Sequence, residues 1–347
     1  MNVYSLMRIF GRIHSRRLRL AGIMALHAAG RRYVGVYLDP VMACNIRCRM
    51  CYMSDPDKRR SYRGERLTEA DLDAVERSLL PRALKLQIGC ATEPTLYPAL
   101  TDVIARGRRA GVPYISITTN GQRVTADDLE QWIEAGLNEI TLSVHGLRAE
   151  SYEYLMTGAR FDRFEALIGI LRQAKRRHPS FKIRLNYVIN SLNLPDLADF
   201  FTGVLAGLDF DVVQLRPFQD VGDTSYSDHN LQSLIDRYDE LIAPVIDRCR
   251  AEGRVCIAPT KENILALDGH TDSFSDYIEE LTYYYVGASS EPERFASSHP
   301  AYDMTAESFG AYHRRTRTMR VMWRRLWRPD PRRTDVTSTK KMNYTVN

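Results

Sequence analysis

Short hydrophobic runs typical of β-strands alternate with longer amphipathic runs typical of helices from residue 33 to about residue 216. The hydrophobic runs predict strands at Tyr33–Leu38, Leu84–Ile88, Tyr114–Thr118, Glu139–Ser143, Lys182–Ile189 and Val212–Leu215. The amphipathic runs predict helices at Thr68–Leu80, Ala99–Ala110, Ala126–Ala135, Phe164–Arg177 and Leu197–Ala206. Strict alternation builds parallel βαβ units, because parallel neighbours need a long crossover. We therefore predict an α/β fold, a partial (β/α)6 TIM-like barrel with helical N- and C-terminal extensions.

The pattern changes beyond Arg216. It predicts a helix near Leu231–Ala251 and a strand at Val255–Ala258, whereas residues 268–312 show no clear periodicity. We predict four segments: a basic amphipathic N-terminal extension (1–32), a core barrel (33–218), a C-terminal substrate or lid region (219–312) and a basic tail (313–347). In a barrel of this kind the loops after the C-terminal ends of the strands form the working face, so we expect any chemistry to cluster there.

Three of the six cysteines lie within eight residues, shortly after the first predicted strand. Cys44, Cys48 and Cys51 have the spacing C-x-x-x-C-x-x-C, and three thiolates in one loop can bind three irons of a four-iron cluster while the fourth iron has no protein ligand. A structural zinc site is the main alternative, but zinc normally takes four ligands, and no second cysteine pair or flanking histidine is present. A thioredoxin-like redox pair leaves the third thiol without a role. The spacing therefore favours an iron–sulfur site with an open coordination position.

A triad with this spacing, after the first strand of a βα-repeat domain, resembles the radical SAM superfamily over about residues 33–218. The resemblance implies one 4Fe-4S cluster on Cys44, Cys48 and Cys51, with S-adenosylmethionine bound to the fourth iron through its amino and carboxylate groups. It also implies that an electron from a flavodoxin or ferredoxin-type donor splits the sulfonium. The released 5′-deoxyadenosyl radical then abstracts a hydrogen atom from the substrate.

Further motifs at the predicted strand ends match the superfamily in part. The resemblance implies cofactor contacts from Met50, Tyr52, Gly89, Glu93, Pro94, Thr119, Asn120, Ser143, Arg184, Asn186 and Arg216. Among these, Glu93 is expected to receive the methionine ammonium, a charge-assisted contact. Relatives have two glycines before this glutamate; here Ala91 and Thr92 stand in their place, and Gly89 supplies part of the backbone freedom.

Some of these positions also have simpler interpretations. The segment Thr119-Asn120-Gly121 is a common turn sequence. Arg184 and Asn186 share one face of a strand, which points either into the barrel or to solvent. His145 stands where many relatives have an acid, so its role stays open, and a structural role is the commoner one for a histidine beside a strand end.

Cys90, Cys249 and Cys256 lack the cysteine-rich pattern of relatives that carry auxiliary clusters, so we expect a single cluster. Each is a candidate donor of a hydrogen atom to a substrate radical, as in radical epimerases, or else a buried small hydrophobic residue. Without auxiliary clusters a redox-neutral or epimerising outcome is favoured over oxidation. We expect the substrate to be a peptide modified after translation, and the alternative is a sugar or lipid-linked glycan intermediate.

Positive charge is concentrated at the two ends of the chain. The net charge is +5, yet residues 1–33 carry seven arginines and no acid, and residues 313–347 carry eleven Lys and Arg against two acids, so the body is acidic. A nucleic-acid binder carries its positive charge over its working face. We therefore expect no nucleic-acid partner.

Both basic ends have an amphipathic pattern. Met319, Met322, Trp323, Leu326 and Trp327 have the spacing of one apolar face of a helix. Residues 6 to 26 have a similar, looser pattern with Leu6, Phe10, Ile13, Leu20 and Met24. These stripes suit either peripheral contact with a membrane or packing on the ends of the barrel. No run is long enough to span a bilayer and no secretory signal is visible, so we expect a cytoplasmic protein with, at most, surface contact with a membrane. The opposing hypothesis is that the protein is not an enzyme but a binding module that uses the triad as a structural metal site.

Overall fold

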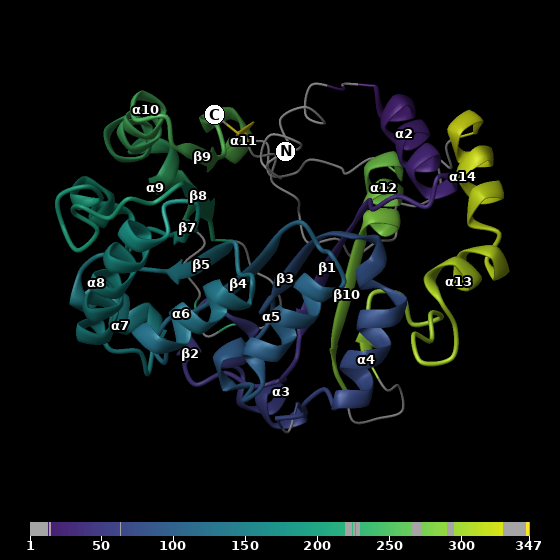
Figure 1. The fold of residues 1–347 in the computed structure, drawn as a ribbon. Coiled ribbons are helices and arrows are strands. Elements are labelled where there is room, and N and C mark those ends of the chain that lie inside the picture. The colour runs from purple at the N-terminus through teal and green to yellow at the C-terminus, as the bar shows by residue number, and fades with distance from the viewer. Residues whose placement is uncertain are drawn as a thin grey trace.

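The chain folds around one long, mostly parallel β-sheet. The computed structural model describes residues 13, 15–62, 64–218, 224, 226, 230–265, 273–289, 295–328 and 345–346. Within these residues the sheet has ten strands in the order β11-β10-β1-β3-β4-β5-β7-β8-β9-β12 (Figure 1). The eight strands from β10 to β9 are parallel, and β11 and β12 add to the two edges in the antiparallel sense. Because the sheet keeps two edges, the barrel is partial, and the predicted α/β class is confirmed.

Six of the strands are those predicted for the βα repeat, and a seventh is the one predicted beyond it. The strands are β1 (Val34–Asp39), β3 (Ala83–Ile88), β4 (Ile115–Thr119), β5 (Glu139–Val144), β7 (Lys182–Ile189), β8 (Val212–Pro217), β9 (Val255–Ala258), β10 (Tyr283–Ala288), β11 (Phe295–Ser297) and β12 (Thr345–Val346). A separate pair joins β2 (Arg47–Cys48) to β6 (Met156–Thr157).

Helices α4, α5, α6 and α8 lie along one face of the sheet (Figure 1). The described helices are α2 (Arg16–Ala28), α3 (Pro56–Ser61), α4 (Glu69–Ser78), α5 (Leu100–Arg109), α6 (Ala126–Ala135), α7 (Ala149–Leu155), α8 (Phe161–Arg177), α9 (Leu231–Asp236), α10 (Ala243–Ala251), α11 (Lys261–Leu265), α12 (Ser273–Thr282), α13 (Phe309–Arg315) and α14 (Thr318–Trp327). The expected pairing of Thr68 with Asp71 forms a capping box that fixes the start of α4. None of these helices is long and apolar enough to cross a membrane.

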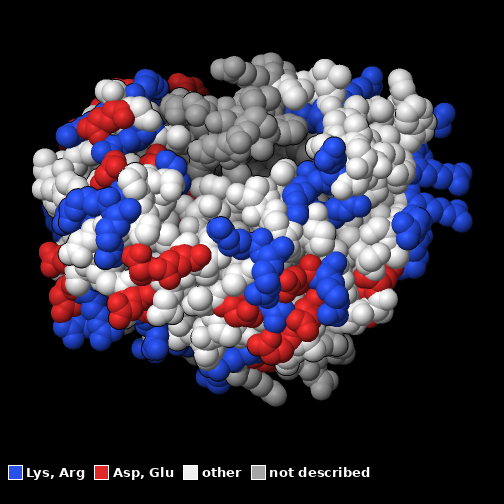
Figure 2. Space-filling view, in the orientation of Figure 1, with Lys and Arg blue, Asp and Glu red and all other residues white. Residues whose placement is uncertain are grey.

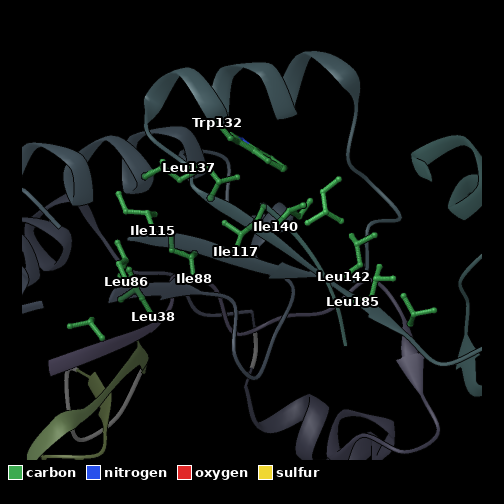
Figure 3. Close-up of a cluster of buried hydrophobic side chains, with 14 of the residues drawn as sticks. Leu38, Leu86, Ile88, Ile115, Ile117, Trp132, Leu137, Ile140, Leu142 and Leu185 are labelled. Carbon is green, nitrogen blue, oxygen red and sulfur yellow. The ribbon is translucent and has the colours of Figure 1, made fainter. Parts of the chain in front are cut away.

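The two faces of the sheet differ in polarity. The face under the helices is hydrophobic, and Figure 3 shows Trp132 of α6 between that helix and the strands that carry Ile117 and Ile140. The opposite face carries polar side chains, because successive residues of a strand point to opposite faces. On β3 and β4, for example, Gln87 contacts both neighbouring hydroxyls, donating to Thr118 Oγ1 at 2.5 Å and accepting from Ser116 Oγ at 2.8 Å. The concave side of the partial barrel is therefore polar.

Two predicted helices were wrong in extent. Residues 197–206 form no α-helix; a 3₁₀ turn at Leu194–Asp199 is followed by turns that end at Gly207, whose φ of 71° breaks any helix. The helix predicted over 231–251 is divided into α9, a π-helical turn at Tyr238–Ile242, and α10. Pro244 at the start of α10 explains the break, since proline has no N–H to donate to the preceding turn.

Residues without a clear pattern in the sequence supply an edge of the sheet. Strand β10 pairs in parallel with β1, on the side away from β3. The predicted amphipathic positions Leu6 and Phe10 lie outside the described residues, as does the predicted basic tail beyond Arg328 apart from β12.

Candidate active site

The three closely spaced cysteines line one cavity at the carboxyl ends of the parallel strands. The cavity has a volume of about 240 Å³. Its walls come from the loops after β1 and β3 and from the ends of β4, β5, β7 and β8, as expected for the working face of a barrel. The lining residues are Cys44, Ile46, Cys48, Met50, Cys51, Met53, Cys90, Ala91, Thr92, Glu93, Thr118, Thr119, Asn120, Ser143, His145, Val188, Arg216, Pro217 and Phe218.

Backbone contacts hold the cysteine loop in place. Residues Arg47 and Cys48 form β2, which pairs with β6. The Arg59 guanidinium donates to the carbonyls of Cys44 at 2.9 Å and Ile46 at 3.3 Å. These contacts fix the loop from outside the cavity and leave its sulfurs facing inward, so the metal-binding end of the loop is preorganised.

The three thiols are buried groups that would have to give up their protons to bind a metal cluster. Burial raises the pKa of Cys44 to about 11 and also raises the pKa values of Cys48 and Cys51. Metal binding must therefore displace their protons. Weak donors already face two of the sulfurs: Met53 N–H lies 3.4 Å from Cys51 Sγ, and Asn120 Nδ2 lies 3.8 Å from Cys44 Sγ.

A single zinc ion fits this arrangement less well than a cluster. One ion requires its ligands to converge on one point, whereas the three cysteines of a cluster bind three different irons. In the described part of the chain, no group of three or more His, Cys, Asp or Glu side chains is arranged to hold a metal ion. Three cysteines around one cavity match the number of protein ligands of a cluster with an open iron.

Asp39, the last residue of β1, shapes the loop after β3. Its carboxylate is fully buried and accepts hydrogen bonds from Cys90 N at 2.8 Å and Ala91 N at 3.0 Å. Gly89 begins this loop with a φ of 78°, and a Cβ at that position would lie 2.4 Å from Thr118 O. Only a glycine fits at this position without moving the backbone of β4.

Glu93 joins the loop after β3 to the end of β4. Its Oε1 accepts from Thr119 Oγ1 at 2.6 Å, Thr95 Oγ1 at 2.7 Å and Thr95 N at 3.2 Å, and its Oε2 accepts from Asn120 N at 2.8 Å. Burial raises the pKa of Glu93, although these hydrogen bonds oppose the shift. The carboxylate therefore has a structural role at the cavity wall. Its Oε2 accepts a single described hydrogen bond.

The opposite wall carries cationic and neutral donors. Ser143 at the end of β5 and Arg216 on β8 line the cavity, and Arg216 forms no ion pair with the residues that the structure describes. His145 is buried beside them, and its Nδ1 has no hydrogen-bond partner among the described residues. Burial, together with the nearby charge of Arg216, lowers the pKa of His145 to about 4, so the ring is neutral. Met50 accepts a hydrogen bond from Asn190 Nδ2 at 3.0 Å.

Several predicted site residues support the cavity without lining it. The Tyr52 hydroxyl donates to Ala91 O at 3.0 Å, while Gly89 and Pro94 shape the loop around Glu93. Arg184 contacts Gln214 on the polar face. Burial raises the pKa of Tyr37 on β1, which the charge of Arg184 opposes, and burial lowers the pKa of Lys85 on β3 to about 8, to which the charge of Arg184 adds.

Arg184 therefore faces the concave side of the barrel and not solvent. Asn186 lies two residues along the same strand, level with the cavity residue Ser143, and its Oδ1 is buried without a partner among the described residues. Neither Arg184 nor Asn186 lines the cysteine cavity.

The three remaining cysteines are separated by the fold. Cys90 is exposed and lines the cavity. Cys249 on α10 and Cys256 on β9 are completely buried, and Cys256 is level with Val213, near the amino end of β8. The structure thus brings one of the three candidate hydrogen donors to the cysteine triad.

Sequence reasoning missed part of the cavity and most of the polar barrel face. Phe218, Val188 and Met53 complete the cavity wall. The polar face could have been predicted from the alternation of polar and hydrophobic residues along the strands, as with Lys85 and Gln87 on β3.

Comparison with known proteins agrees with this geometry. The sequence model of the radical SAM superfamily matches residues 38–200. A probable GTP 3′,8-cyclase of Metallosphaera sedula is 33% identical over 151 residues, which are 43% of this chain and 45% of that protein. A GTP 3′,8-cyclase of Tolumonas auensis is 28% identical over 251 residues, or 71% of this chain and 67% of that protein. The chain thus spans about half to two thirds of the length of these relatives.

The fold also matches solved structures. Streptococcus suis SuiB bound to S-adenosylmethionine superimposes with a TM-score of 0.54 at 17% identity, covering 76% of this chain and 60% of SuiB. This similarity concerns the fold alone. The assignment rests on the sequence match: residues 38–200, which contain the cysteine triad at the carboxyl end of β1, are a radical SAM segment, and enzymes of that superfamily use a 4Fe-4S cluster and S-adenosylmethionine.

Proposed function

We propose that this chain is a radical SAM enzyme that epimerises a residue of a peptide substrate, with Cys90 as the donor of the returning hydrogen atom. The observation that carries the proposal is the position of Cys90, which is exposed inside the cavity that the three cluster cysteines also line. Strand β1 and its buried Asp39 connect the two features, since the cysteine loop follows β1 and Asp39 holds the backbone of Cys90.

The residues of the cavity would divide the work of holding the cofactors. Cys44, Cys48 and Cys51 would bind three irons, and the lining residues include no fourth cysteine within that loop. When bound, the cluster and S-adenosylmethionine supply a 5′-deoxyadenosyl radical that removes a hydrogen atom from a substrate carbon. Glu93 is the acceptor proposed for the methionine ammonium, and Arg216 is the cation proposed for the carboxylate.

Cys90 has the protonation state that hydrogen-atom donation requires. Although the residue is exposed to the cavity, protein atoms surround its thiol; this desolvation raises the pKa of Cys90 above the ordinary thiol value, and the negative charge of Asp39 adds to the shift. At neutral pH the side chain is therefore S–H and not thiolate. The S–H bond breaks and a C–H bond forms on the opposite face of the substrate radical, which leaves a thiyl radical on Cys90. One electron from a ferredoxin or flavodoxin-type donor and one proton restore the thiol, so the substrate is neither oxidised nor reduced.

Two further observations support this reaction class. In the described residues outside the triad, Cys249 and Cys256 pack together in the core, away from the cavity, and Cys90 has no cysteine beside it that could complete a second cluster. A reaction without an auxiliary electron acceptor is redox-neutral. The peptide class is supported by the fold shared with SuiB, which has been solved with its precursor peptide SuiA at a TM-score of 0.53.

The cofactor assignment is tested by anaerobic reconstitution. The protein should take up about four irons per chain and release 5′-deoxyadenosine when dithionite and S-adenosylmethionine are added. Cys48→Ala should abolish both. Zinc content without cleavage would instead support a structural metal site.

The Cys90 assignment is tested by isotope transfer in D2O. Synthetic peptides encoded by neighbouring open reading frames serve as substrates, and the product is analysed for one incorporated deuterium and inverted chirality. Cys90→Ser should keep the release of 5′-deoxyadenosine and lose the deuterated epimer, because the serine O–H bond is too strong to donate a hydrogen atom. Cys249→Ala is the matched control, since that thiol lies outside the cavity. A deuterated epimer from Cys90→Ser, or a cross-linked or unsaturated product from the wild type, would refute the proposal.

A further inference from the structure

Helix α14 presents two tryptophans to solvent. The side chains of Trp323 and Trp327 are 58% and 61% exposed, and Met319 one turn earlier is 38% exposed. The predicted stripe does not pack as a unit, because Met322 is completely buried against the core while the tryptophans point outward. Their rings meet edge to face with centroids 5.8 Å apart. Exposing two adjacent tryptophans is unfavourable in water and indicates a partner.

A row of unpaired arginines runs beside the tryptophans. Arg320, Arg324 and Arg328 each follow a member of the Met319, Trp323, Trp327 row by one residue, so the two rows lie side by side along the helix. Residues 308–328 contain no acid, and none of the three arginines forms an ion pair with another described residue.

Some other arginines of the chain are neutralised. Arg106 contacts four carboxylates, and Arg315, one turn before α14, pairs with Glu307. The α14 row differs from these two in carrying its charge beside exposed tryptophans.

Helix α2 enlarges this basic end of the molecule. It packs against α14 and has no acidic residue, and its Leu18 is 65% exposed between the exposed Arg16 and Arg17 and Arg19 (Figure 1). Figure 2 shows Lys and Arg side chains projecting from the edge of the molecule formed by α13 and α14. Charge and exposed apolar area therefore occur on the same part of the surface.

We infer that α14 lies flat on an anionic lipid bilayer, with Trp323 and Trp327 in the headgroup layer and the arginine row against lipid phosphates. Tryptophan favours the membrane–water interface, and arginine binds phosphate through two parallel hydrogen bonds. A helix of ten residues is about 15 Å long, too short to cross a bilayer but sufficient to lie in its plane. Nucleic acid fits less well, because two tryptophans on a convex helix offer no groove for stacked bases.

Flotation of the full-length protein with vesicles tests the inference. The protein should float with vesicles of phosphatidylcholine and phosphatidylglycerol, bind far less to phosphatidylcholine alone, and be released by salt. Removing one arginine near an anionic surface weakens binding about fivefold. Combining Arg320→Gln, Arg324→Gln and Arg328→Gln should therefore weaken binding on the order of 100-fold, and Trp323→Ala with Trp327→Ala should abolish flotation.

Two measurements distinguish a specific surface from general charge. Arg123→Gln, Arg163→Gln and Arg176→Gln together form the matched control, because these exposed arginines lie outside α2 and α14, and this variant should float like the wild type. Tryptophan emission should shift to the blue on vesicle addition. The shift would come from Trp323 and Trp327, because Trp132 is buried and its environment does not change. Equal flotation of both triple variants, no flotation of the wild type, or arginine-dependent binding to duplex DNA in place of vesicles would overturn the inference.

Discussion

Replacing Glu93 with glutamine tests whether the buried carboxylate organises the cavity wall. The wild-type side chain accepts four hydrogen bonds, two from the backbone N–H groups of Thr95 and Asn120 and two from the hydroxyls of Thr95 and Thr119. A glutamine has one accepting oxygen. If its NH2 group takes the place of Oε1, both hydroxyls can rotate to accept, but the Thr95 N–H loses its acceptor. If the NH2 group takes the place of Oε2, it meets the Asn120 N–H.

The magnitude follows from this count. At least one buried donor is left unsatisfied in Glu93→Gln, which costs about 1–3 kcal/mol of unfolding free energy. The lower half of that range is expected, because burial raises the pKa of Glu93 and a neutral amide avoids that burial cost. Glu93→Ala leaves both backbone donors without an acceptor and should cost about 2–6 kcal/mol.

Urea unfolding of the three apoproteins, followed by tryptophan fluorescence, measures these differences. Reconstituted protein measures function separately: Glu93→Gln should release less 5′-deoxyadenosine at limiting S-adenosylmethionine, because the amide carries no charge for the ammonium. Wild-type stability in Glu93→Ala, or a glutamine variant as unstable as the alanine variant, would show that the hydrogen-bond count does not govern this wall.

Three other outcomes follow from the structure. Asp39→Asn should lower the unfolding free energy by about 1–3 kcal/mol, measured in urea, because Cys90 N–H and Ala91 N–H bond to different carboxylate oxygens and the NH2 group of asparagine replaces one of these acceptors. Gly89→Ala should destabilise the protein more than Gly207→Ala. Both glycines have a positive φ, 78° and 71°, but an added Cβ at Gly89 would lie 2.4 Å from the backbone oxygen of Thr118, whereas at Gly207 the nearest atom is Arg172 Nε at 4.0 Å. Equal melting points of the two variants would contradict this. Burial lowers the pKa of His313 to about 3, so the neutral ring's contribution is complete above pH 6.5 and is lost as the pH falls toward 3; His313→Gln should flatten the pH dependence of stability there by up to about 1.4 kcal/mol per pH unit.

The strands of the core were predictable because their hydrophobic residues alternate with polar ones, a period of two that helices do not share. Lys182–Ile189 has the same bounds in the sequence prediction and in the structure, and its buried residues alternate strictly. The end of α6 was equally clear, because Gly136 takes a left-handed conformation that stops the helix.

The errors arose where local pattern and long-range pairing disagree. The run 197–206 has helical spacing, but Gly203 and Gly207 weaken a helix, and the segment forms tight turns. Strand β10 was not assigned, although Tyr and Val favour strands, because its parallel partner β1 lies about 250 residues earlier and no local signal indicates that pairing.

Site residues that belong to recognisable motifs at strand ends could be predicted from the sequence. Residues whose position is set only by the packing of the fold could not. Motif spacing identified the cysteine loop, Glu93 and Asn120, which all line the cavity. Spacing could not distinguish Cys90 from Cys256, because a thiol at a strand end and a thiol in the core look alike in a sequence. The distinction depends on where each residue lies along the barrel: Cys90 follows the carboxyl end of β3, whereas Cys256 is level with Val213 near the amino end of β8.

The place of β10 in the sheet constrains how the protein is made. A nascent chain that has reached residue 218 contains β1 and its cysteine loop, but the strand that covers the far edge of β1 is still missing. Until residues 283–288 leave the ribosome, that edge exposes unpaired backbone groups of the kind that recruit other strands and promote aggregation. A truncated product ending before β10 should therefore be more prone to aggregation than the full chain.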